Sequence, residues 1–493
     1  MQITQQNPTF IELNDLSDNE VEALNKLLTY TDKTAQYAAE RFKKAYWFES
    51  KFGREAFVEE LARLKSLVKV SLLKSRANGS FYTYSGLLPL IKSSGLVSPA
   101  DTGPLFKAYP KASLLALEQS LPQLRPYQQV MVERLLKANH GAASACTGSG
   151  KSICLVKVIN ELGLKTLIIA PSVSIASQLY QDCLKYFGKK RVGMFGDGKK
   201  EFKKLITIGI AQSLTKLEPG DEAYKEFSKI QVLIGDESHL VSTDTQVKIA
   251  EGFAINCPYR FFFSATQFRN DGSDMLLQGI TGEICFEYDL RQAVKEGYLA
   301  KPTFIVKRTT SDSPRYCKTA LEVLKHHLYE NKKLHQEAAT LANQLLAKDL
   351  RVMIMIDHVN QFTRLLPHLT TKPEFAHGGL NKENKKGVPE LYHKSDVVDL
   401  VNRFNAKEFP LLIGTSCIGM GTDTRPVDAI INLQGGQSDI KFMQLIGRGT
   451  RRVPGKTGFM FFDFDITNQD SMHRWFMTRL TLFKTLSDEI KFI

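Results

Sequence analysis

Several features that would place this chain outside a reducing, aqueous compartment are missing from its sequence. The longest apolar runs, such as residues 352–356, are far too short to cross a bilayer, so we expect no membrane partner. The first residues lack a basic patch followed by an apolar stretch, so we expect no export signal. No Cys-x-x-Cys pair occurs among the seven cysteines, which are Cys146, Cys154, Cys183, Cys257, Cys285, Cys317 and Cys417. An odd, scattered set of cysteines predicts reduced thiols in a cytoplasmic protein, not disulfides or a zinc site.

The sequence also lacks internal repeats and low-complexity tracts. Its 493 residues are too many for one hydrophobic core, so two or three domains are expected. The apolar fraction of 43% and the charged fraction of 24% are ordinary for a globular protein. The net charge of +13, from 65 basic and 52 acidic residues, fits a polyanionic partner but does not establish one.

Short β-branched or aliphatic runs alternate with amphipathic helical stretches from Leu124 onward. The expected strands are residues 166–170, 206–210, 232–235 and 260–263, and then, after a pause near residues 297–302, residues 303–306, 352–356, 411–414, 429–433 and 458–463. A long helical stretch is expected at residues 320–348. Apolar strands separated by helices indicate an α/β fold with parallel sheets covered on both faces.

The order of these elements predicts two consecutive parallel-sheet domains behind a small α+β N-terminal domain. The expected boundaries are residues 1–119, 120–302 and 303–470, with a C-terminal helix over residues 471–493. In the N-terminal domain we expect helices at residues 19–30 and 56–73 and a strand at residues 80–85.

The strongest motif is the segment Ala-Cys-Thr-Gly-Ser-Gly-Lys-Ser at residues 145–152. It matches the phosphate-binding loop G-x-x-x-x-G-K-[ST], except that Ala145 replaces the first glycine. Small residues allow successive backbone N–H groups to surround phosphates, and the loop residues concerned are Thr147, Gly148, Ser149 and Gly150. Lys151 would reach the β- and γ-phosphates, and the Ser152 hydroxyl would bind Mg²⁺. A glycine-rich turn followed by a chance Lys-Ser pair is the alternative.

A second motif is an apolar strand that ends in two acids, Asp236 and Glu237, followed by Ser238 and His239. Paired carboxylates at a strand end opposite a phosphate loop suit metal binding and water activation. Asp236 would hold Mg²⁺, and Glu237 would orient and deprotonate the attacking water. Acids that merely lead a strand into a loop are the alternative, which the spacing after Lys151 makes improbable.

A third motif lies near the end of the chain, where Gln444, Gly447, Arg448 and Arg451 occur in one short segment. Arg448 and Arg451 share a face if the segment is helical. An arginine placed here can neutralise charge on a transferred phosphoryl group. A basic solvated helix, or a direct nucleic-acid contact, is the alternative.

Together these motifs resemble those of superfamily 2 helicases over roughly residues 124–465. Residues 124–128 (LRPYQ) are similar to the adenine-reading Q-like motif, residues 168–178 to motif Ia, residues 208–214 to motif Ic, and residues 264–266 to motif III. Residues 414–415 and 419–423 resemble motif V, and residues 444–451 resemble motif VI.

The resemblance implies two RecA-like domains that bind ATP and Mg²⁺ between them. The residues expected at the nucleotide include Arg125, Tyr127, Gln128, Gly421 and Asp423, with Gln444, Arg448 and Arg451 from motif VI. His239, Ser264 and Thr266 would couple hydrolysis to domain movement. The residues expected to grip the DNA backbone without reading its sequence are Pro171, Ser172, Gln178, Gln212, Ser213 and Thr415.

Motif II reads Asp-Glu-Ser-His and not Asp-Glu-Ala-Asp, which argues against a DEAD-box RNA helicase. Residues 264–272 and 297–302 resemble the group that contains restriction-enzyme motor subunits, XPB-type helicases and phage UvsW-like helicases. Residues 81–90 resemble the N-terminal domain of the UvsW-like helicases, and the stretch after motif VI is too short for a nuclease domain. The resemblance therefore implies a helicase for forked or branched DNA that works with recombination, repair or replication proteins in the cytoplasm of a phage-infected bacterium.

Basic and aromatic residues are interleaved in the N-terminal stretch from residue 41 to residue 54. Cations such as Lys43, Lys44 and Arg54 would meet phosphates, while Trp47 would stack on exposed bases. An amphipathic helix with a buried aromatic face and a solvated basic face is an equal alternative.

Three functions remain open at this point. They are a branch-migrating or unwinding DNA helicase, the motor subunit of a restriction system that needs nuclease partners, and an ATP-gated clamp that binds nucleic acid with little turnover. The presence of Lys151, Glu237 and Arg451 argues against the clamp.

Overall fold

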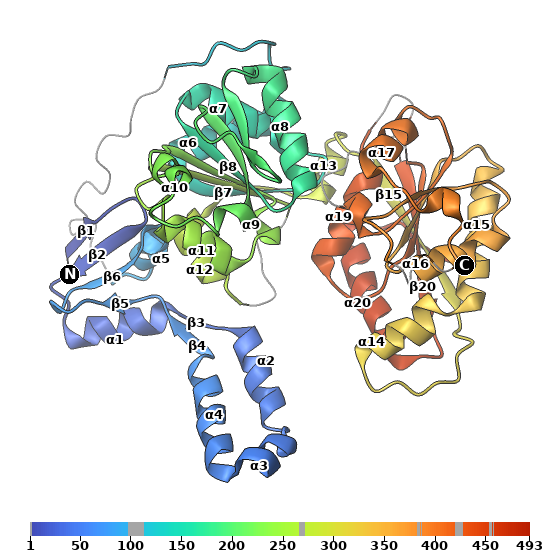
Figure 1. The fold of residues 1–493 in the computed structure, drawn as a ribbon, viewed down its shortest axis with the longest axis horizontal. Helices are drawn as coiled ribbons and strands as arrows, with labels where there is room; N and C mark the ends of the chain where they lie inside the picture. Colours follow the sequence, from blue (N-terminus) through green and yellow to red (C-terminus); the bar gives the residue numbers. More distant parts are fainter. Residues whose placement is uncertain are drawn as a thin grey trace. The chain divides into compact units, whose positions relative to one another are not determined.

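The computed structural model describes residues 2–96, 113–265, 272–381, 385, 387–419, 427–452, 456 and 458–493. The chain forms two compact units, one of residues 1–144 and 151–287 and the other of residues 145–150 and 288–493. Each unit contains its own large sheet (Figure 1). Among the described residues, no helix has both the length and the apolar content that a bilayer crossing requires.

The first unit begins with a four-stranded antiparallel sheet in the order β1-β2-β6-β5. Its strands are β1 (Gln2–Gln5), β2 (Phe10–Asn14), β5 (Lys74–Ser75) and β6 (Phe81–Tyr84). Helix α1 (Asp18–Leu27) starts at a capping box, in which Ser17 and Glu20 satisfy each other's backbone N–H groups. A 3-10 turn, η1 (Ser85–Leu87), and helix α5 (Leu88–Ser93) complete this part.

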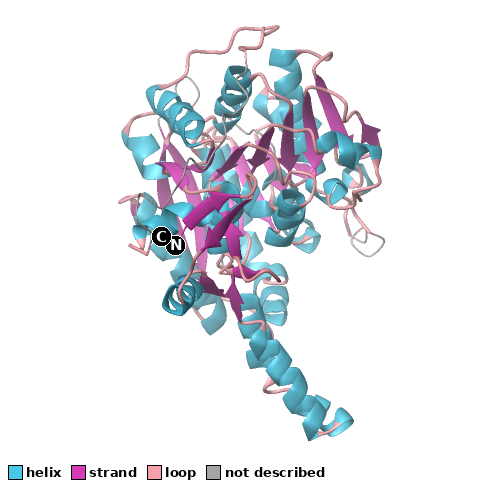
Figure 2. Ribbon diagram, turned by 90° about the vertical axis from the view of Figure 1, so that its left-hand side faces the viewer, coloured by secondary structure: helices cyan, strands magenta, loops and turns pink. Residues whose placement is uncertain are grey.

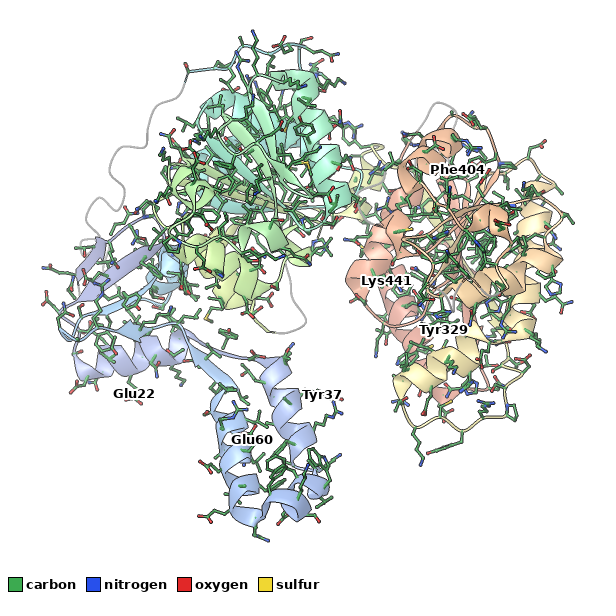
Figure 3. All side chains as sticks on the ribbon, viewed as in Figure 1. Glu22, Tyr37, Glu60, Tyr329, Phe404 and Lys441 are labelled. Carbon is green, nitrogen blue, oxygen red and sulfur yellow. The ribbon has the colours of Figure 1, made fainter. Side chains whose placement is uncertain are left out.

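A helical arm, which we define as residues 29–71, is inserted between α1 and β5. Strands β3 (Thr29–Thr31) and β4 (Lys69–Ser71) pair antiparallel at its base. The helices α2 (Lys33–Phe42), α3 (Tyr46–Phe52) and α4 (Arg54–Ser66) form the rest of the arm, as Figures 1 and 2 show. Figure 3 marks Tyr37 on α2 and Glu60 on α4. Neither α3 nor α4 has a buried residue, so the arm has almost no core of its own.

The main sheet of the first unit has eight strands in the order β10-β9-β11-β8-β12-β13-β7-β14. Its strands are β7 (His140–Ala145), β8 (Thr166–Ala170), β9 (Val192–Gly196), β10 (Lys199–Lys200), β11 (Ile206–Ile210), β12 (Val232–Asp236), β13 (Tyr259–Ser264) and β14 (Ile284–Tyr288). Its helices are α6 (Pro126–Ala138), α7 (Lys151–Leu162), α8 (Val173–Phe187), α9 (Ala211–Leu214), α10 (Glu222–Phe227), α11 (Thr243–Glu251) and α12 (Asp274–Thr281). The central strands pair in parallel and are buried along their whole length, as their continuous apolar runs require.

The N-terminal antiparallel sheet, β1-β2-β6-β5, packs against α11 and α12 through a shared hydrophobic core and buried polar contacts. Ala250 and Ile280 belong to the same hydrophobic cluster as the apolar side chains of the N-terminal sheet. The buried Arg260 guanidinium donates to Thr9 Oγ1 and to the Ala254 carbonyl. Tyr84 donates its hydroxyl to Glu251 Oε1 at 2.6 Å. Removal of the N-terminal sheet would therefore uncover apolar surface and deprive Arg260 of a partner.

The second unit is built on a seven-stranded sheet in the order β17-β18-β16-β19-β20-β15-β21. The strands, which pair in parallel, are β15 (Lys301–Thr309), β16 (Val352–Ile356), β17 (Glu374–Ala376), β18 (Leu411–Gly414), β19 (Ala429–Leu433), β20 (Gly458–Ile466) and β21 (Ile490–Phe492). Its main helices are α15 (Lys332–Leu346), α16 (Val359–Leu365), α17 (Val397–Asn405), α19 (Asp439–Gly449) and α20 (Asp470–Leu486). The predicted α/β class, with two parallel sheets behind a small α+β part, is confirmed.

All four predicted helices differ from the observed elements. The predicted helix 19–30 ends at Leu27, because Thr29–Thr31 pair as β3. The predicted helix 320–348 is interrupted: α14 (Ala320–Val323) runs into a π-helical turn, η4 (Leu324–Tyr329), and α15 starts afresh because Asn331 caps it. The predicted helix 56–73 ends at Ser66, because the next residues pair as β4. The predicted C-terminal helix 471–493 ends at Leu486, and β21 then joins the sheet beside β15.

Candidate nucleotide-binding site

The predicted phosphate loop connects β7 to α7. Gly148 and Gly150 have φ values of +88° and +83°, in the left-handed region that side chains disfavour, so glycine is needed at both positions. The Ser149 N–H donates to the Cys146 carbonyl at 3.2 Å and tightens the turn. Ala145, which replaces the expected first glycine, is the last residue of β7. Since Ala145 is extended, alanine is acceptable there.

Lys151 and the two motif II acids form a buried charge cluster in the first unit. Lys151 is the first residue of α7, and its Nζ lies 3.6 Å from Glu237 Oε1. Asp236 ends β12, and both Lys151 and Asp236 are 8% exposed. Glu237 has φ +46° and ψ +45°, a left-handed conformation that costs a non-glycine residue about 1–3 kcal/mol, so the surrounding structure must hold it.

The surroundings shift the pKa values of the two acids in opposite directions. Burial, reinforced by the negative charge of Glu237, raises the pKa of Asp236. Burial also acts to raise the pKa of Glu237, but the charges of Lys151 and His239 and hydrogen bonds from Lys151 and the Ala265 backbone outweigh it. The pKa of Glu237 is therefore lowered, which keeps this carboxylate ionised and able to accept a proton.

A series of polar contacts, which we call the relay, extends from Glu237 to the end of β13 through one ion-pair contact and one hydrogen bond. His239 Nδ1 lies 3.5 Å from Glu237 Oε2 and 2.5 Å from Ser264 Oγ. Ser264 is the last residue of β13, which pairs with both β12 and β7. The relay thus joins the predicted coupling residues His239 and Ser264 to the predicted base.

Gln246 supports this turn and was not predicted from the sequence. Its Nε2 donates to the Ser238 carbonyl at 2.8 Å and to the Val241 carbonyl at 3.0 Å from the first turns of α11. Gln246 therefore fixes the backbone that follows Glu237. A single glutamine inside an amphipathic helix carries no signal in the sequence that would have singled it out.

The donor set fits a nucleotide and its Mg²⁺. The buried Asp236 and the half-buried Glu237 are next to one lysine, an arrangement that a divalent cation would neutralise further. Thr147 Oγ1 is buried without a hydrogen-bond partner among the described residues, as expected of a group that meets a ligand. Ser152, the second residue of α7, is half-buried and is the candidate hydroxyl ligand.

The predicted adenine-reading residues lie at the start of α6. Gln128 is buried, and its Oε1 accepts from the Arg125 N–H at 2.9 Å. The Arg125 guanidinium donates to the Tyr127 hydroxyl at 3.0 Å. The three residues thus form one local cluster around the N-terminus of this helix.

The motif VI residues Gln444, Gly447 and Arg448 lie on α19 of the second unit, and Arg451 follows the end of this helix. Arg448 is buried, Gln444 and Arg451 are half-buried, and burial lowers the pKa of Arg451 to about 10, so that it stays charged at neutral pH. A Cβ at Gly449 would lie 2.2 Å from the Phe459 ring, so glycine permits α19 to pack against β20. Arg451 forms a β-bridge with Leu299, which fixes the end of the motif.

Two protein-family models match the chain one after the other. The model described as "Type III restriction enzyme, res subunit" matches residues 121–269, and "Helicase conserved C-terminal domain" matches residues 336–453. The first match contains Lys151 and Glu237, and the second contains Arg448 and Arg451. This chain belongs to helicase superfamily 2. Its two parallel sheets are the tandem RecA-like domains of that superfamily.

Similar proteins of this superfamily include the DNA 3'-5' translocase XPB2 of Sulfurisphaera tokodaii, 27% identical over 197 residues, which are 39% of this chain and 43% of that protein. The fragment structure of a putative HsdR subunit of a type I restriction enzyme from Vibrio vulnificus is 18% identical, with a TM-score of 0.52 over 74% of this chain and 67% of that chain. The crystal structure of T4 UvsW is 15% identical over 100% of this chain and 99% of its own, with a TM-score of 0.44 that by itself establishes no common fold. This superfamily 2 chain spans about half the length of the curated relatives it matches.

The residues that the family resemblance assigns to nucleic-acid contact lie near the carboxyl ends of the strands. Ser172 caps α8 by accepting from the Ile175 N–H, and Gln178 is exposed on that helix. Gln212 is exposed and Ser213 half-buried on α9, directly after β11, while Thr415 follows β18. Pro171 is half-buried between β8 and α8. Three further predicted residues, Thr266, Gly421 and Asp423, lie outside the described residues.

The basic and aromatic residues predicted at the N-terminus lie at the far end of the arm. Phe42 packs on Phe48 and on Phe57 with ring centroids 5.0 and 5.1 Å apart, which is the small aromatic core of the alternative interpretation. Trp47 nevertheless remains 65% exposed. Lys43, Lys44 and Arg54 are exposed as well. Lys43 Nζ lies 3.2 Å from Glu40 Oε1, and Arg54 Nη1 lies 3.8 Å from Glu49 Oε1. Each interpretation therefore describes part of the aromatic set.

Proposed function

We propose that this chain is an ATP-dependent DNA helicase or translocase that unwinds or branch-migrates forked or branched DNA. The observation that carries the proposal is the relay Lys151–Glu237–His239–Ser264, which links a phosphate-binding lysine, a base and the end of β13. A clamp that merely binds nucleotide has no need for a carboxylate held ionised in a left-handed turn.

In this proposal the chain's own groups prepare the phosphate for attack by water. Gly148 and Gly150 turn backbone N–H groups toward the phosphates, and Lys151 leaves Glu237 to neutralise the β- and γ-phosphates. Ser152 and Asp236 would hold Mg²⁺, which when bound supplies positive charge against the phosphate oxygens. Glu237 then orients the water and accepts its proton.

The other motif residues complete the proposed cycle. Arg448 and Arg451 would neutralise charge that develops on the transferred phosphoryl group, with Gln444 beside them. His239 and Ser264 would transmit the state of Glu237 to the segment after β13. Arg125, Tyr127 and Gln128 would position the adenine.

The proposed choice of branched DNA depends on the arm. Translocation along a strand does not by itself select a junction, so an additional surface must do so. The exposed Trp47 and the nearby cations combine ring stacking with phosphate binding, which suits unpaired bases at a branch point. Recombination, repair or replication of DNA, in a phage-infected bacterium, is the setting that this activity fits.

The experiment that tests the proposed function is an ATPase assay with single-stranded, duplex, forked and four-way DNA, and with RNA as the control. We expect strong stimulation by DNA, strongest with forked or four-way DNA, and weak stimulation by RNA. Equal turnover without nucleic acid and with every substrate would contradict a DNA-driven motor.

A motor subunit of a restriction system is the second candidate. It is favoured by the description of the family model over residues 121–269 and by a type I restriction endonuclease subunit from Escherichia coli, 24% identical over 415 residues. The two candidates differ in their need for partners. Unwinding of forked DNA by the purified chain alone supports a helicase, whereas ATPase without strand separation supports a motor subunit.

A further inference from the structure

The chain carries much of its net positive charge in one short segment of the first unit. Residues 185–204, which we call the basic hairpin, have eight lysines or arginines and two acids, a net charge of +6 out of +13 for the chain. The basic residues are Lys185, Lys189, Lys190, Arg191, Lys199, Lys200, Lys203 and Lys204. Such a concentration of one sign in a folded segment is costly through self-repulsion unless an anion offsets it.

The fold brings the two ends of this segment together. Asp197 and Gly198, with φ values of +52° and +77°, form a two-residue turn between β9 and β10. A Cβ at Gly193 would lie 2.1 Å from the Glu201 carbonyl oxygen, so the segment after β10 crosses directly over β9. Lys204 Nζ then donates to the carbonyls of Lys189 and Lys190 at 3.4 and 3.3 Å. Lys204 is therefore held beside Lys189 and Lys190 at the start of β9, while Lys199 and Lys200 lie at its other end, beside the turn.

Most of this charge is not neutralised within the protein. Lys189, Lys190, Lys199 and Lys200 are exposed, and within the described residues none of them forms an ion pair. Lys203 is paired with Glu222 at 2.6 Å.

The acids nearby are few. Asp197 lies in the turn, Glu118 lies beside Gly188, and Asp182 lies on α8. Glu201 is partly committed, since its Oε2 accepts from the Met194 N–H at 3.3 Å. None of these acids is paired with the four exposed lysines, so the net positive character of the surface remains.

The hairpin lies next to two of the segments assigned to nucleic-acid contact. Lys199 Nζ is 5.1 Å from the ring centroid of Tyr180 on α8, the helix that Ser172 caps. A Cβ at Gly196 would lie 2.8 Å from Ser213 Oγ. The β9–β10 turn is therefore in contact with both α8 and α9.

The aromatic residues of the basic hairpin are buried or half-buried, in contrast to the exposed Trp47 of the arm. Phe202 is half-buried and packs on Phe195 and Phe227. Tyr186, Phe187 and Phe195 are all less than 10% exposed. Cations without exposed rings can meet phosphates but offer no platform for unpaired bases. The double helix has the denser row of phosphates, with about one charge per 1.7 Å of its axis.

We propose that the basic hairpin is a second DNA-binding surface, which holds the backbone of duplex DNA beside the segments at Ser172 and Ser213. This inference rests on the proposed function, because it assumes that those segments contact DNA. The double-stranded part of a fork would then bind the first unit at the basic hairpin, while the unpaired bases would meet Trp47 at the tip of the helical arm.

The test is a triple variant, Lys190→Gln, Lys199→Gln and Lys200→Gln, compared with a control of equal charge change in the second unit, Lys332→Gln, Lys348→Gln and Lys372→Gln. The three control lysines are also exposed. Fluorescence anisotropy over a salt series measures affinity for a blunt duplex and for a single strand of the same length.

We expect the triple variant to lose about tenfold in duplex affinity. We also expect the slope of log K against log salt to fall in magnitude by about 2–3, since each lost phosphate contact removes about 0.9. The control and the Lys→Arg version of the triple variant should match the wild type.

The inference is overturned if the triple variant binds duplex DNA like the control, or if it loses more affinity for the single strand than for the duplex. These outcomes are distinct from failure of the proposed function. If the proposed function fails, the wild type itself shows no DNA-stimulated ATPase, whether or not the triple variant binds DNA.

Discussion

Lys151 and Glu237 neutralise each other at the centre of the nucleotide site, so each determines the state of the other. Their side chains are 8% and 20% exposed, and the lysine is one of the charges that keep the pKa of Glu237 low. Substitutions here act on charge more than on packing, and they should separate ATP binding from hydrolysis.

Lys151→Ala should reduce DNA-stimulated ATPase by at least about 10²-fold, because it removes the charge that stabilises the transferred phosphoryl group. Steady-state turnover measures this, with thermal unfolding to show that the variant is folded. Lys157→Ala is the matched control, since Lys157 is on the same helix and its Nζ pairs with Glu161 Oε1 at 2.6 Å, away from Glu237. Wild-type turnover in Lys151→Ala would remove the phosphate-loop assignment.

Glu237→Gln should bind ATP and DNA normally while hydrolysis slows by about 10²–10⁴-fold, since glutamine keeps the shape of the side chain and loses the base. Nucleotide binding by a fluorescent ATP analogue and single-turnover hydrolysis separate the two effects. Loss of binding together with turnover would mean that Glu237 is structural.

Mg²⁺-nucleotide binding should release a proton from Asp236. Because burial raises the pKa of Asp236, more of this carboxyl is protonated as the pH falls, and a cation requires it ionised. Calorimetry in buffers of different ionisation enthalpy should therefore show greater proton release at about pH 6 than at about pH 9. Asp236→Asn is the control that should abolish the difference, and a wild type without buffer dependence contradicts the assignment.

At the scale of elements, the arm and the N-terminal sheet must be tested separately. A deletion of residues 1–115 would remove both, and it would uncover the apolar faces of α11 and α12 that pack on the N-terminal sheet. A defect of such a truncation would report instability as well as lost DNA contact. The β3–β4 pairing offers a cleaner excision point, because Thr31 and Lys69 are direct cross-strand partners.

Replacement of residues 32–68 by the dipeptide Asn-Gly should keep the fold and much of the stimulated ATPase, since a two-residue turn suits an antiparallel pair. The variant should lose its preference for four-way DNA and unwind junctions at least about tenfold more slowly, because exposed stacking groups and cations are removed. Reversal of Lys43, Lys44 and Arg54 to glutamate should give a milder form of the same defect. Unwinding of four-way DNA at the full-length rate by the folded variant would assign the arm another role.

For the whole molecule, affinity for DNA should fall steeply with salt and depend little on sequence. The surfaces assigned to DNA are hydroxyls, amides and cations, which contact phosphates, so counterion release dominates binding. With six or more phosphates contacted, affinity should fall by about 10³-fold or more between about 50 and 200 mM salt. A strong preference for one duplex sequence at constant salt would contradict this.

The sequence determined the central strands and the first half of the site, because these depend on local patterns. Residues 166–170, 206–210, 352–356, 411–414 and 429–433 were predicted as strands and are observed with those bounds. A strand buried on both faces must be apolar along its whole length, so the signal is strong. The phosphate loop and the strand with two acids were equally visible, since backbone geometry and chemistry restrict the residue types at each position.

Only the tertiary structure decided how the non-local pieces meet. Residues 490–492 were predicted as helix, but they complete a sheet with β15, nearly two hundred residues earlier. The contacts of Arg260 with Thr9 and of His239 with Ser264 join segments that are far apart in the chain. The eight cations of the basic hairpin were countable in the sequence, but only the crossing at Gly193 brings Lys204 back beside Lys189 and Lys190. Local propensity cannot specify such pairings, because their free energy comes from burial and hydrogen bonds that exist only after the chain has folded.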